Sequence, residues 1–257
     1  MRILIIRHGE PDYTIDGLTE KGHREAKLLS LRLKETELDQ IYVSPLGRAQ
    51  ETCRYTLEAT GKTAVTLQWL QEFRGKTFDP DRGIVRIPWD YRAGRWRGDT
   101  SLLDEDTWTD HPIFEGGTVG DVWAETREGL DAVLRANGYE RQGRIYRVRE
   151  RNMRTIAFFC HFGIGSAILS HLTGIPLMAL WHGTCWLPTG VTTVVTQERD
   201  EGVADFRCVC LGDLAHLAAA KEPASLFGMF PEVYNGCDST SPTKWPEGDA
   251  KAARPLT

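Results

Sequence analysis

The chain has 257 residues, a formal net charge of -5 and 41% hydrophobic residues. This length is enough for one sizeable core, and the acidic balance argues against a nucleic-acid binder, which is usually strongly basic. No apolar run is long enough to cross a bilayer, and the four apolar residues near the N-terminus are too few for a signal peptide, so we expect a cytoplasmic protein with no membrane partner.

Apolar runs and helix signals alternate along the first seventy residues. Residues 3–6 form a short apolar run that predicts a buried strand. Thr19 is a suitable N-cap for the helix that follows. The apolar or small side chains of this helix recur at helical spacing and define its buried face: Leu18, Gly22, Ala26, Leu29 and Leu33.

A second strand–helix pair follows. Residues 41–43 predict a short strand, and Ser44 is positioned to cap the next helix with Pro45 at its first position. Residues 64–67 predict a third strand that ends near Glu72.

Residues 73–115 interrupt this alternation. The stretch is rich in Gly, Pro, Trp and Arg and has no sustained period. Connections of this length are usually functional loops or disordered segments. Trp89, Trp96 and Trp108 favour an ordered lid.

Regular patterns resume at Thr118, which we interpret as an N-cap with Asp121 three residues later. The helical face then consists of Val122, Thr126, Leu130 and Val133. The arginine-rich segment 141–154 is interpreted as a solvated connection.

The last third of the chain predicts three more strands. The run 156–160 predicts a buried strand, followed by a helix that ends at Gly174. Residues 191–197 and 206–211 predict two strands paired as a hairpin, and the polar tail at 232–257 is expected to be partly flexible. The alternation predicts an α/β fold with a mostly parallel sheet, built as a single domain over residues 1–257 with an insertion at 73–115.

Two histidines follow predicted strands directly: His8 after the first, with Arg7 beside it, and His161 after the strand that ends at Cys160. Ligands of open α/β sheets bind beyond the carboxyl ends of the strands. Arg48 lies in the first turn of a predicted helix, where N–H groups and the helix dipole favour phosphate. These residues together predict an anion-binding site.

The order of these motifs resembles the histidine phosphatase superfamily, in its phosphoglycerate-mutase-like branch. The motifs are Arg7-His8-Gly9-Glu10, Ser44-Pro45-Leu46-Gly47-Arg48-Ala49, Glu72, Gly116-Gly117-Thr118 and His161. The resemblance covers residues 1 to about 215, apart from the insertion, and implies a three-layer α/β/α sandwich.

The resemblance also implies a role for each matching residue. His8 would be the nucleophile that forms a phosphohistidine, while Arg7, Arg48 and His161 would surround the phosphate. Glu72 would protonate the leaving alkoxide. No metal and no cofactor is implied, and six scattered cysteines with no zinc-ribbon spacing agree with that expectation.

The chain departs from the family pattern at the rim of the site. Thr14 stands where many members have an Asn that helps hold the phosphate, and Phe162 intervenes before the glycine that usually follows the second histidine. Glu115 and Asp79 remain alternatives to Glu72 as the proton donor. Because Thr14 and Phe162 stand at these departures and Trp89 and Trp96 lie in the lid, we expect all four to contact substrate.

The resulting hypothesis is a metal-independent phosphomonoesterase that hydrolyses a small phosphorylated metabolite. A phosphoglycerate mutase is the first alternative. The family's mutases open Arg-His-Gly-Glu-Ser-x-Trp-Asn, whereas this chain continues Pro11-Asp12-Tyr13. A non-catalytic regulatory protein on the same fold is the second alternative, and the sequence leaves open whether the chain forms a homodimer.

Overall fold

The fold is built on an eight-stranded mixed sheet, seen in a computed structural model that describes residues 1–79 and 83–229. The strand order is β5 (Val65–Thr66), β4 (Gln40–Val43), β10 (Thr155–Cys160), β1 (Arg2–Arg7), β11 (Val191–Asp200), β12 (Val203–Asp213), β9 (Ile145–Val148) and β8 (Tyr139–Gln142). The first four strands are parallel, and the remaining neighbours are antiparallel. The α/β class is confirmed, but the expectation of a mostly parallel sheet is wrong, because two hairpins supply half of the strands.

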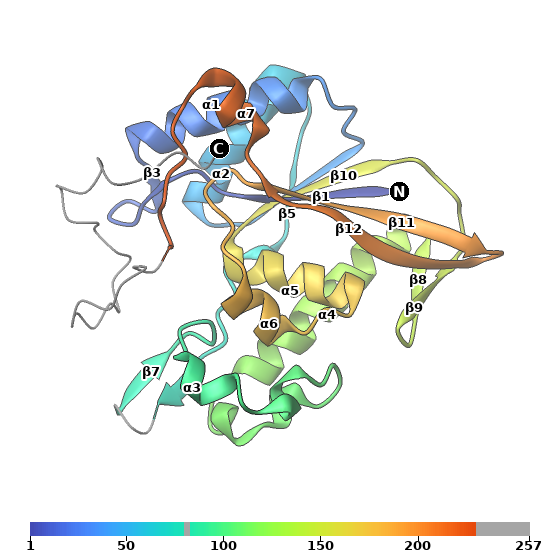
Figure 1. Cartoon of the computed structure of the whole chain (residues 1–257). Coiled ribbons are helices and arrows are strands. Elements are labelled where there is room, and N and C mark those ends of the chain that lie inside the picture. The colour runs from blue at the N-terminus through green and yellow to red at the C-terminus, as the bar shows by residue number, and fades with distance from the viewer. Residues whose placement is uncertain (80–82, 230–257) are drawn as a thin grey trace.

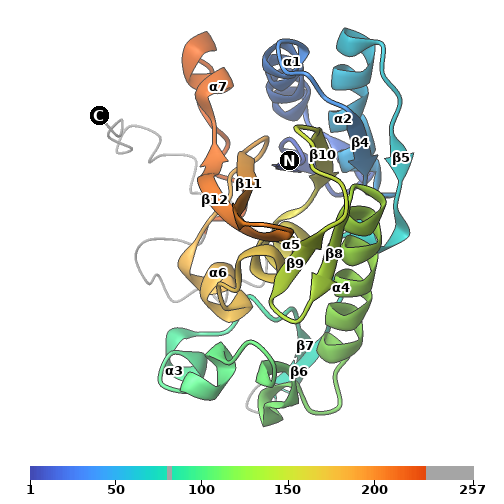
Figure 2. The ribbon, with the colours of Figure 1, turned by 90° about the vertical axis from the view of Figure 1, so that its right-hand side faces the viewer.

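Helices cover both faces of this sheet, which confirms the three-layer arrangement (Figures 1 and 2). One layer holds α1 (Glu20–Lys34), α2 (Gly47–Thr60) and α7 (Ala215–Ala220), and the other holds α4 (Val119–Ala136), α5 (Phe162–Thr173) and α6 (Leu177–Gly183). Alternate residues of β1 pack into the two layers: Leu4 and Ile6 join the core under α1, and Ile3 and Ile5 join the core under α5.

The insertion at 73–115 lies against the α4–α6 layer, on the side away from the sheet (Figure 1). It contains β6 (Thr77–Asp79), β7 (Ile84–Arg86), α3 (Ala93–Trp96) and short 3-10 helices at Thr100–Leu103, Trp108–Asp110 and Pro112–Phe114. Trp108 packs edge-on against Trp123 and Trp181, with ring centroids 5.8 Å apart in each pair. These aromatic contacts order the insertion although its sequence has no period.

Two of the predicted helix boundaries are confirmed. The Thr19 hydroxyl accepts the Gly22 N–H at 3.0 Å at the start of α1, and Gly174, at φ +73°, ends α5. The expectation for Ser44 is wrong, because α2 begins at Gly47 and the Asp16 carboxylate accepts the Gly47 N–H at 2.7 Å. Thr118 precedes α4 as expected, but its hydroxyl accepts the N–H of Lys76 in the insertion.

The arginine-rich segment differs most from expectation. It folds largely as the β8–β9 hairpin, in which Tyr139 and Tyr146 are fully buried while the exposed Arg144 and Arg149 form ion pairs. The two tyrosines, one on each strand, outweigh the arginines because each ring buries a large apolar area. The short helices α6 and α7 were not predicted, nor were the two-residue strands β2 (Pro11–Asp12) and β3 (Gly17–Leu18) and the 3-10 turn Gln68–Leu70.

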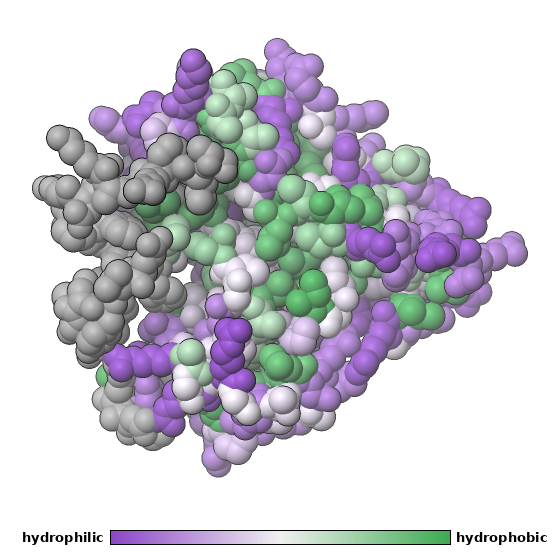
Figure 3. Space-filling view, in the orientation of Figure 1, coloured by the Kyte–Doolittle hydropathy of each residue, from purple (hydrophilic) through white to green (hydrophobic). Residues whose placement is uncertain are grey.

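One face of the molecule is apolar where β11 and β12 run and hydrophilic toward the turn between them (Figure 3). Val209 and Leu211 of β12 are about half exposed there. In residues 1–79 and 83–229, no helix is both long and apolar enough to span a membrane. The tail predicted at 232–257 lies outside the described residues.

Candidate active site

The two strand-end histidines are brought together by strand register. β1 and β10 are neighbouring parallel strands with Arg7 opposite Cys160, so His8 and His161 follow at the same edge. The His8 N–H donates to the Cys160 carbonyl at 3.0 Å, and the two imidazole centroids lie 5.0 Å apart. His8 is 2% exposed and His161 is fully buried. The predicted pairing of these histidines is present in the structure.

The His8 imidazole is held in one tautomer. Its Nδ1 lies 2.7 Å from the Gly9 carbonyl oxygen, and a carbonyl can only accept, so Nδ1 carries the proton. Burial, followed by the positive charges of Arg7 and Arg48, lowers the pKa of His8 well below its ordinary value. The ring is therefore neutral, with a lone pair on Nε2, as a nucleophile requires.

His161 is held by a residue whose role the sequence did not indicate. Its Nε2 lies 2.7 Å from the Ser44 hydroxyl, which sequence reasoning had assigned to a helix cap. Burial is the main cause that lowers the pKa of His161, with His8 and the two arginines adding to it. Its Nδ1 is buried and has no hydrogen-bond partner in the part of the chain that the structure describes.

The Arg7 guanidinium is buried without an opposite charge paired to it among the described residues. The Arg7 side chain donates to the Trp186 carbonyl, whereas among the described residues its Nε has no hydrogen-bond partner and its guanidinium forms no ion pair. Burial lowers the pKa of the Arg7 guanidinium. A buried charge is costly unless it is paired, so this position favours an anionic ligand.

Arg48 lies in the first turn of α2, as predicted, and is fixed from two sides. Its Nη1 donates to Asp16 Oδ1 at 2.5 Å, and its guanidinium lies 5.2 Å from the centre of the Tyr13 ring. The Arg48 Nε is buried and has no partner among the residues described. Asp16 and Tyr13 therefore orient Arg48 and leave donor capacity for a ligand.

The loop after β1 requires glycine. A Cβ on Gly9 would lie 2.8 Å from the Gly22 carbonyl oxygen of α1, which is too close. The Gly9 N–H donates to the Thr52 hydroxyl of α2 at 2.9 Å. The close approach to α1 and the bond to α2 hold the backbone that bears His8.

Glu72 meets the site from the start of the insertion. Its Oε1 accepts the backbone N–H groups of Phe73 at 2.7 Å and of Ile164, in the first turn of α5, at 3.0 Å. Burial raises the pKa of the Glu72 carboxyl above its ordinary value, against the opposing effects of these hydrogen bonds and of Arg48. A raised pKa suits a group that donates a proton.

Trp89 and Glu72 both lie close to Gly163. A Cβ on Gly163 would lie 2.5 Å from the Trp89 ring and 2.7 Å from Glu72 Oε1, so indole and carboxyl meet over this glycine. Phe162 packs edge-on against Trp89, with ring centroids 6.3 Å apart. Of the four predicted rim residues, Trp89 thus lies close to Glu72, and Phe162 packs against Trp89.

The other two rim residues lie elsewhere. Thr14 is exposed and donates its hydroxyl to Asp12 at 2.6 Å. Trp96 is 7% exposed and stacks on His182 of α6, with centroids 4.6 Å apart. Neither Thr14 nor Trp96 has a hydrogen bond or ring contact with His8 or His161 among the described residues.

The alternative proton donors are also placed apart from the histidines. Glu115 is exposed at the end of the insertion, and Asp79 pairs with Arg86 at 3.5 Å within the β6–β7 hairpin. Glu72 is thus the acid that the geometry favours.

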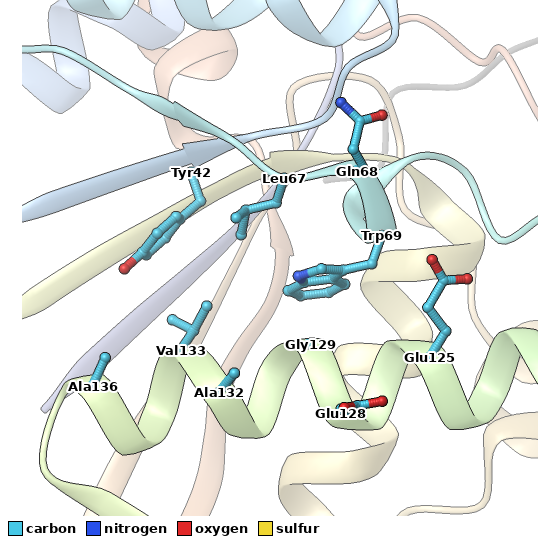
Figure 4. A pocket seen from close by; sticks show the side chains of 10 residues that line it. All are labelled: Tyr42, Leu67, Gln68, Trp69, Glu125, Glu128, Gly129, Ala132, Val133 and Ala136. Atoms are coloured by element: carbon cyan, nitrogen blue, oxygen red, sulfur yellow. The ribbon is translucent and has the colours of Figure 1, made fainter.

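A separate hollow of about 550 Å³ lies between β4, the Trp69 turn and α4 (Figure 4). The Trp69 ring lies over Gly129, where a Cβ would come within 2.5 Å of the indole. None of the strand-end residues lines this hollow. Residues 1–79 and 83–229 also contain no cluster of three His, Cys, Asp or Glu side chains suited to a metal ion.

The fold and the candidate site define an α/β protein that carries two buried histidines and two buried arginines at the carboxyl edge of its sheet. The model of the histidine phosphatase superfamily (branch 1) matches residues 3–208, and the chain belongs to this family.

Several solved structures with the same fold are phosphatases by name. A mutant phosphoserine phosphatase of Entamoeba histolytica, in complex with phosphoserine, is 18% identical, with a TM-score of 0.55 over 84% of this chain and 98% of that chain. Mycobacterial glucosyl-3-phosphoglycerate phosphatase is 20% identical, with a TM-score of 0.56 over 82% and 98%. A putative alpha-ribazole-5'-P phosphatase from Escherichia coli K-12 is 21% identical, with a TM-score of 0.54 over 83% and 98%. At these identities the likeness shows the fold.

Curated relatives are mutases by name and match a shorter stretch. The 2,3-bisphosphoglycerate-dependent phosphoglycerate mutase of Brucella anthropi is 38% identical over 72 residues, which is 24% of this chain and 35% of that protein. The match therefore spans about a third of the relative's length.

Proposed function

We propose that this protein is a phosphomonoesterase that hydrolyses a small phosphorylated metabolite through a phosphohistidine on His8. One observation carries the proposal. The centroid of the neutral His8 ring lies 5.0 Å from that of His161, beside a buried Arg7 guanidinium that has no carboxylate partner among the described residues. A phosphate ester supplies the anion that this arrangement lacks.

In the first step, His8 Nε2 attacks phosphorus. The P–N bond forms as the P–O bond to the alkoxide breaks, and Glu72 gives its proton to the alkoxide oxygen. Arg7, Arg48 and the Nδ1–H of His161 bind the phosphoryl oxygens. The Ser44 hydroxyl, by donating to His161 Nε2, keeps the proton of that ring on Nδ1.

In the second step, the Glu72 carboxylate takes a proton from water. The water oxygen attacks phosphorus, the P–N bond breaks, and inorganic phosphate leaves with His8 neutral again. Phosphoryl transfer depends mainly on positioning and charge stabilisation, which the two guanidiniums supply in this mechanism without a metal ion.

The proposal is tested by trapping the intermediate. Wild-type protein mixed with a radiolabelled phosphate ester and quenched in alkali is expected to retain label on His8, with turnover unaffected by a chelator. His8→Ala should lose the label and at least about 10³-fold in kcat/KM. His23→Ala is the matched control, because His23 is half-exposed and contacts Tyr55 and Glu51. Label on another residue, or a His8→Ala protein with normal turnover, overturns the proposal.

A mutase is the second candidate, favoured by the names of the curated relatives. It would use the same His8 chemistry but pass the phosphoryl group to a second hydroxyl before water attacks. Incubation with 3-phosphoglycerate separates the two activities: we expect phosphate release to exceed isomerisation, and the reverse ratio would favour the mutase.

A further inference from the structure

The loop 186–190, between α6 and β11, forms hydrogen bonds with the side chain of Arg7 and with the backbone of Arg7 and His8. The Arg7 guanidinium donates to the Trp186 carbonyl, and the Arg7 N–H donates to the Gly190 carbonyl at 3.1 Å. The Thr189 N–H donates to the His8 carbonyl at 3.1 Å. Three backbone groups of this short loop therefore determine where the first strand delivers its arginine and histidine.

Thr189 holds its N–H in this place at a conformational cost. Its φ is +60°, and the residue is fully buried. The left-handed region is unfavourable for a β-branched residue and persists only where the surroundings impose it. A glycine would adopt this φ freely, so a threonine here points to a use for its hydroxyl.

That hydroxyl is bound by His216 of α7. His216 Nε2 lies 3.0 Å from Thr189 Oγ1, and Oγ1 donates to the Pro188 carbonyl at 2.7 Å. Because the hydroxyl proton is committed to Pro188, His216 must donate from Nε2, which leaves Nδ1 without a proton. The buried Nδ1 has no partner among the described residues, in agreement with this tautomer.

His216 is kept neutral by its surroundings. Burial, followed by the positive charge of Arg32, lowers the pKa of His216 to about 4, while Asp213 opposes the shift. Arg32 and Asp213 form an ion pair at 2.5 Å beside the ring. In the neutral range the ring therefore keeps the tautomer with the proton on Nε2, which donates to Thr189, and with Nδ1 unprotonated.

We infer that Thr189 and His216 are positioning residues for His8: the His216–Thr189 hydrogen bond holds the strained loop whose N–H fixes the nucleophile's backbone. This rests on the proposed role of His8. The site is then supported from α7, far along the chain from the motifs that carry its chemistry.

The test compares His216→Ala, His216→Gln and Thr189→Val with His171→Ala. Gln can place an amide donor near the position of Nε2, and Val keeps the shape of Thr without its hydroxyl. His171 is the matched control, because it is also a buried histidine whose ring forms a hydrogen bond with a side chain, that of Asp131 at 2.9 Å, on the α4–α5 side.

We expect the rate of phosphoenzyme formation in a single turnover to fall about tenfold in His216→Ala and in Thr189→Val, with KM changed by less than about twofold. The double variant should lose no more than either single variant, because both remove one link. His216→Gln should recover most of the rate. Equal losses in His171→Ala, additive losses in the double variant, or no recovery with Gln would overturn the inference.

A second measurement does not depend on turnover. In protein labelled with nitrogen-15 histidine, the His8 ring resonances should shift or broaden in His216→Ala and remain in place in His171→Ala. Unmoved His8 resonances would refute the positioning role even if the enzyme were active. Failure of the proposed phosphohistidine mechanism would instead be seen in wild-type protein, which would then retain no radiolabel on His8.

Discussion

The edge of the sheet that bears His8 and the insertion at 73–115 are ordered in different ways. At the sheet edge, the parallel register of β1 and β10 places the ring centroids of His8 and His161 5.0 Å apart, directly after the paired residues Arg7 and Cys160. The insertion has little regular structure, and aromatic side chains such as Trp108 fix it to α4 and α6. The two histidines are therefore positioned by main-chain register, while the insertion adjoins them through Trp89, which lies close to Gly163 together with Glu72, the residue just before the insertion.

The largest effect should come from the residue where the two regions meet. Glu72→Gln cannot protonate an alkoxide, so phosphorylation of His8 by an alkyl phosphate should slow by ~10²–10⁴-fold. An aryl phosphate has a leaving group that needs no protonation, so its phosphorylation burst should slow far less. Burst kinetics with both esters check this, and Glu115→Gln is the control because Glu115 is exposed. Equal slowing with both esters would exclude the acid role.

The next largest effect comes from a comparison of two buried arginines, one in each region. Arg48→Ala removes a guanidinium from the site and should lower kcat/KM by ~10²–10³-fold. Arg86→Ala removes an equally buried guanidinium from the insertion, where it pairs with Asp79 and Asp90, and should lower the free energy of unfolding while leaving kcat/KM within about threefold. Steady-state kinetics and denaturant unfolding of both variants check the contrast. Comparable kcat/KM losses would mean that the insertion shapes the site more deeply than its contacts indicate.

The pH dependence tests how Trp89 acts on Glu72. His8, with a lowered pKa, stays neutral well into the acid range, whereas Glu72 must be protonated for the first step, so activity should fall as pH rises through the raised pKa of Glu72. Trp89→Ala lets water reach the carboxyl and lowers its pKa, so this alkaline limb should move to lower pH. A shift of one unit costs about tenfold at a pH above both values. Profiles of kcat/KM against pH for both proteins measure the limb, and an unmoved limb would show that Trp89 does not desolvate Glu72.

The core of this site could be predicted from the sequence because it depends on local order. A strand followed at once by His8 or His161 places that side chain at the sheet edge whatever the rest of the chain does, and Arg48 follows from its helix. Ser44 and His216 could not be assigned in this way. Their contacts, with His161 and Thr189, join residues far apart in the sequence and leave no local pattern.

The same reasoning explains the errors in the fold. The β8–β9 hairpin was interpreted as a solvated connection because its arginines dominate the composition, whereas only the buried face of Tyr139 and Tyr146 decides the packing. The predicted hairpin of residues 191–197 and 206–211 is confirmed as β11 and β12. The proportion of parallel strands was overestimated because β8 and β9 were not expected, and these two hairpins together supply half of the strands.

Within the insertion, Trp96 should affect folding more than catalysis. It is 7% exposed and stacks on His182, so Trp96→Ala should lower the free energy of unfolding by about 3 kcal/mol. Its kcat/KM for a small phosphate ester should stay within about threefold of wild type, as measured below the unfolding transition. A selective loss with bulky esters would instead place Trp96 in a substrate subsite.

The smallest effect is expected at Thr14, on the site side of the comparison. Its position in the sequence suggests a phosphate contact, but its hydroxyl donates to Asp12 and its side chain is exposed. Thr14→Val should therefore change kcat/KM by less than about twofold, since an exposed neutral hydrogen bond contributes little. Titration of inorganic phosphate as an inhibitor checks this directly, because a Thr14 that closes on bound phosphate would weaken inhibition in the variant. Such weakening would mean that the loop 11–18 rearranges when the anion binds. The place of Thr14 in the sequence motif would then indicate a phosphate contact that this loop does not form in its present arrangement.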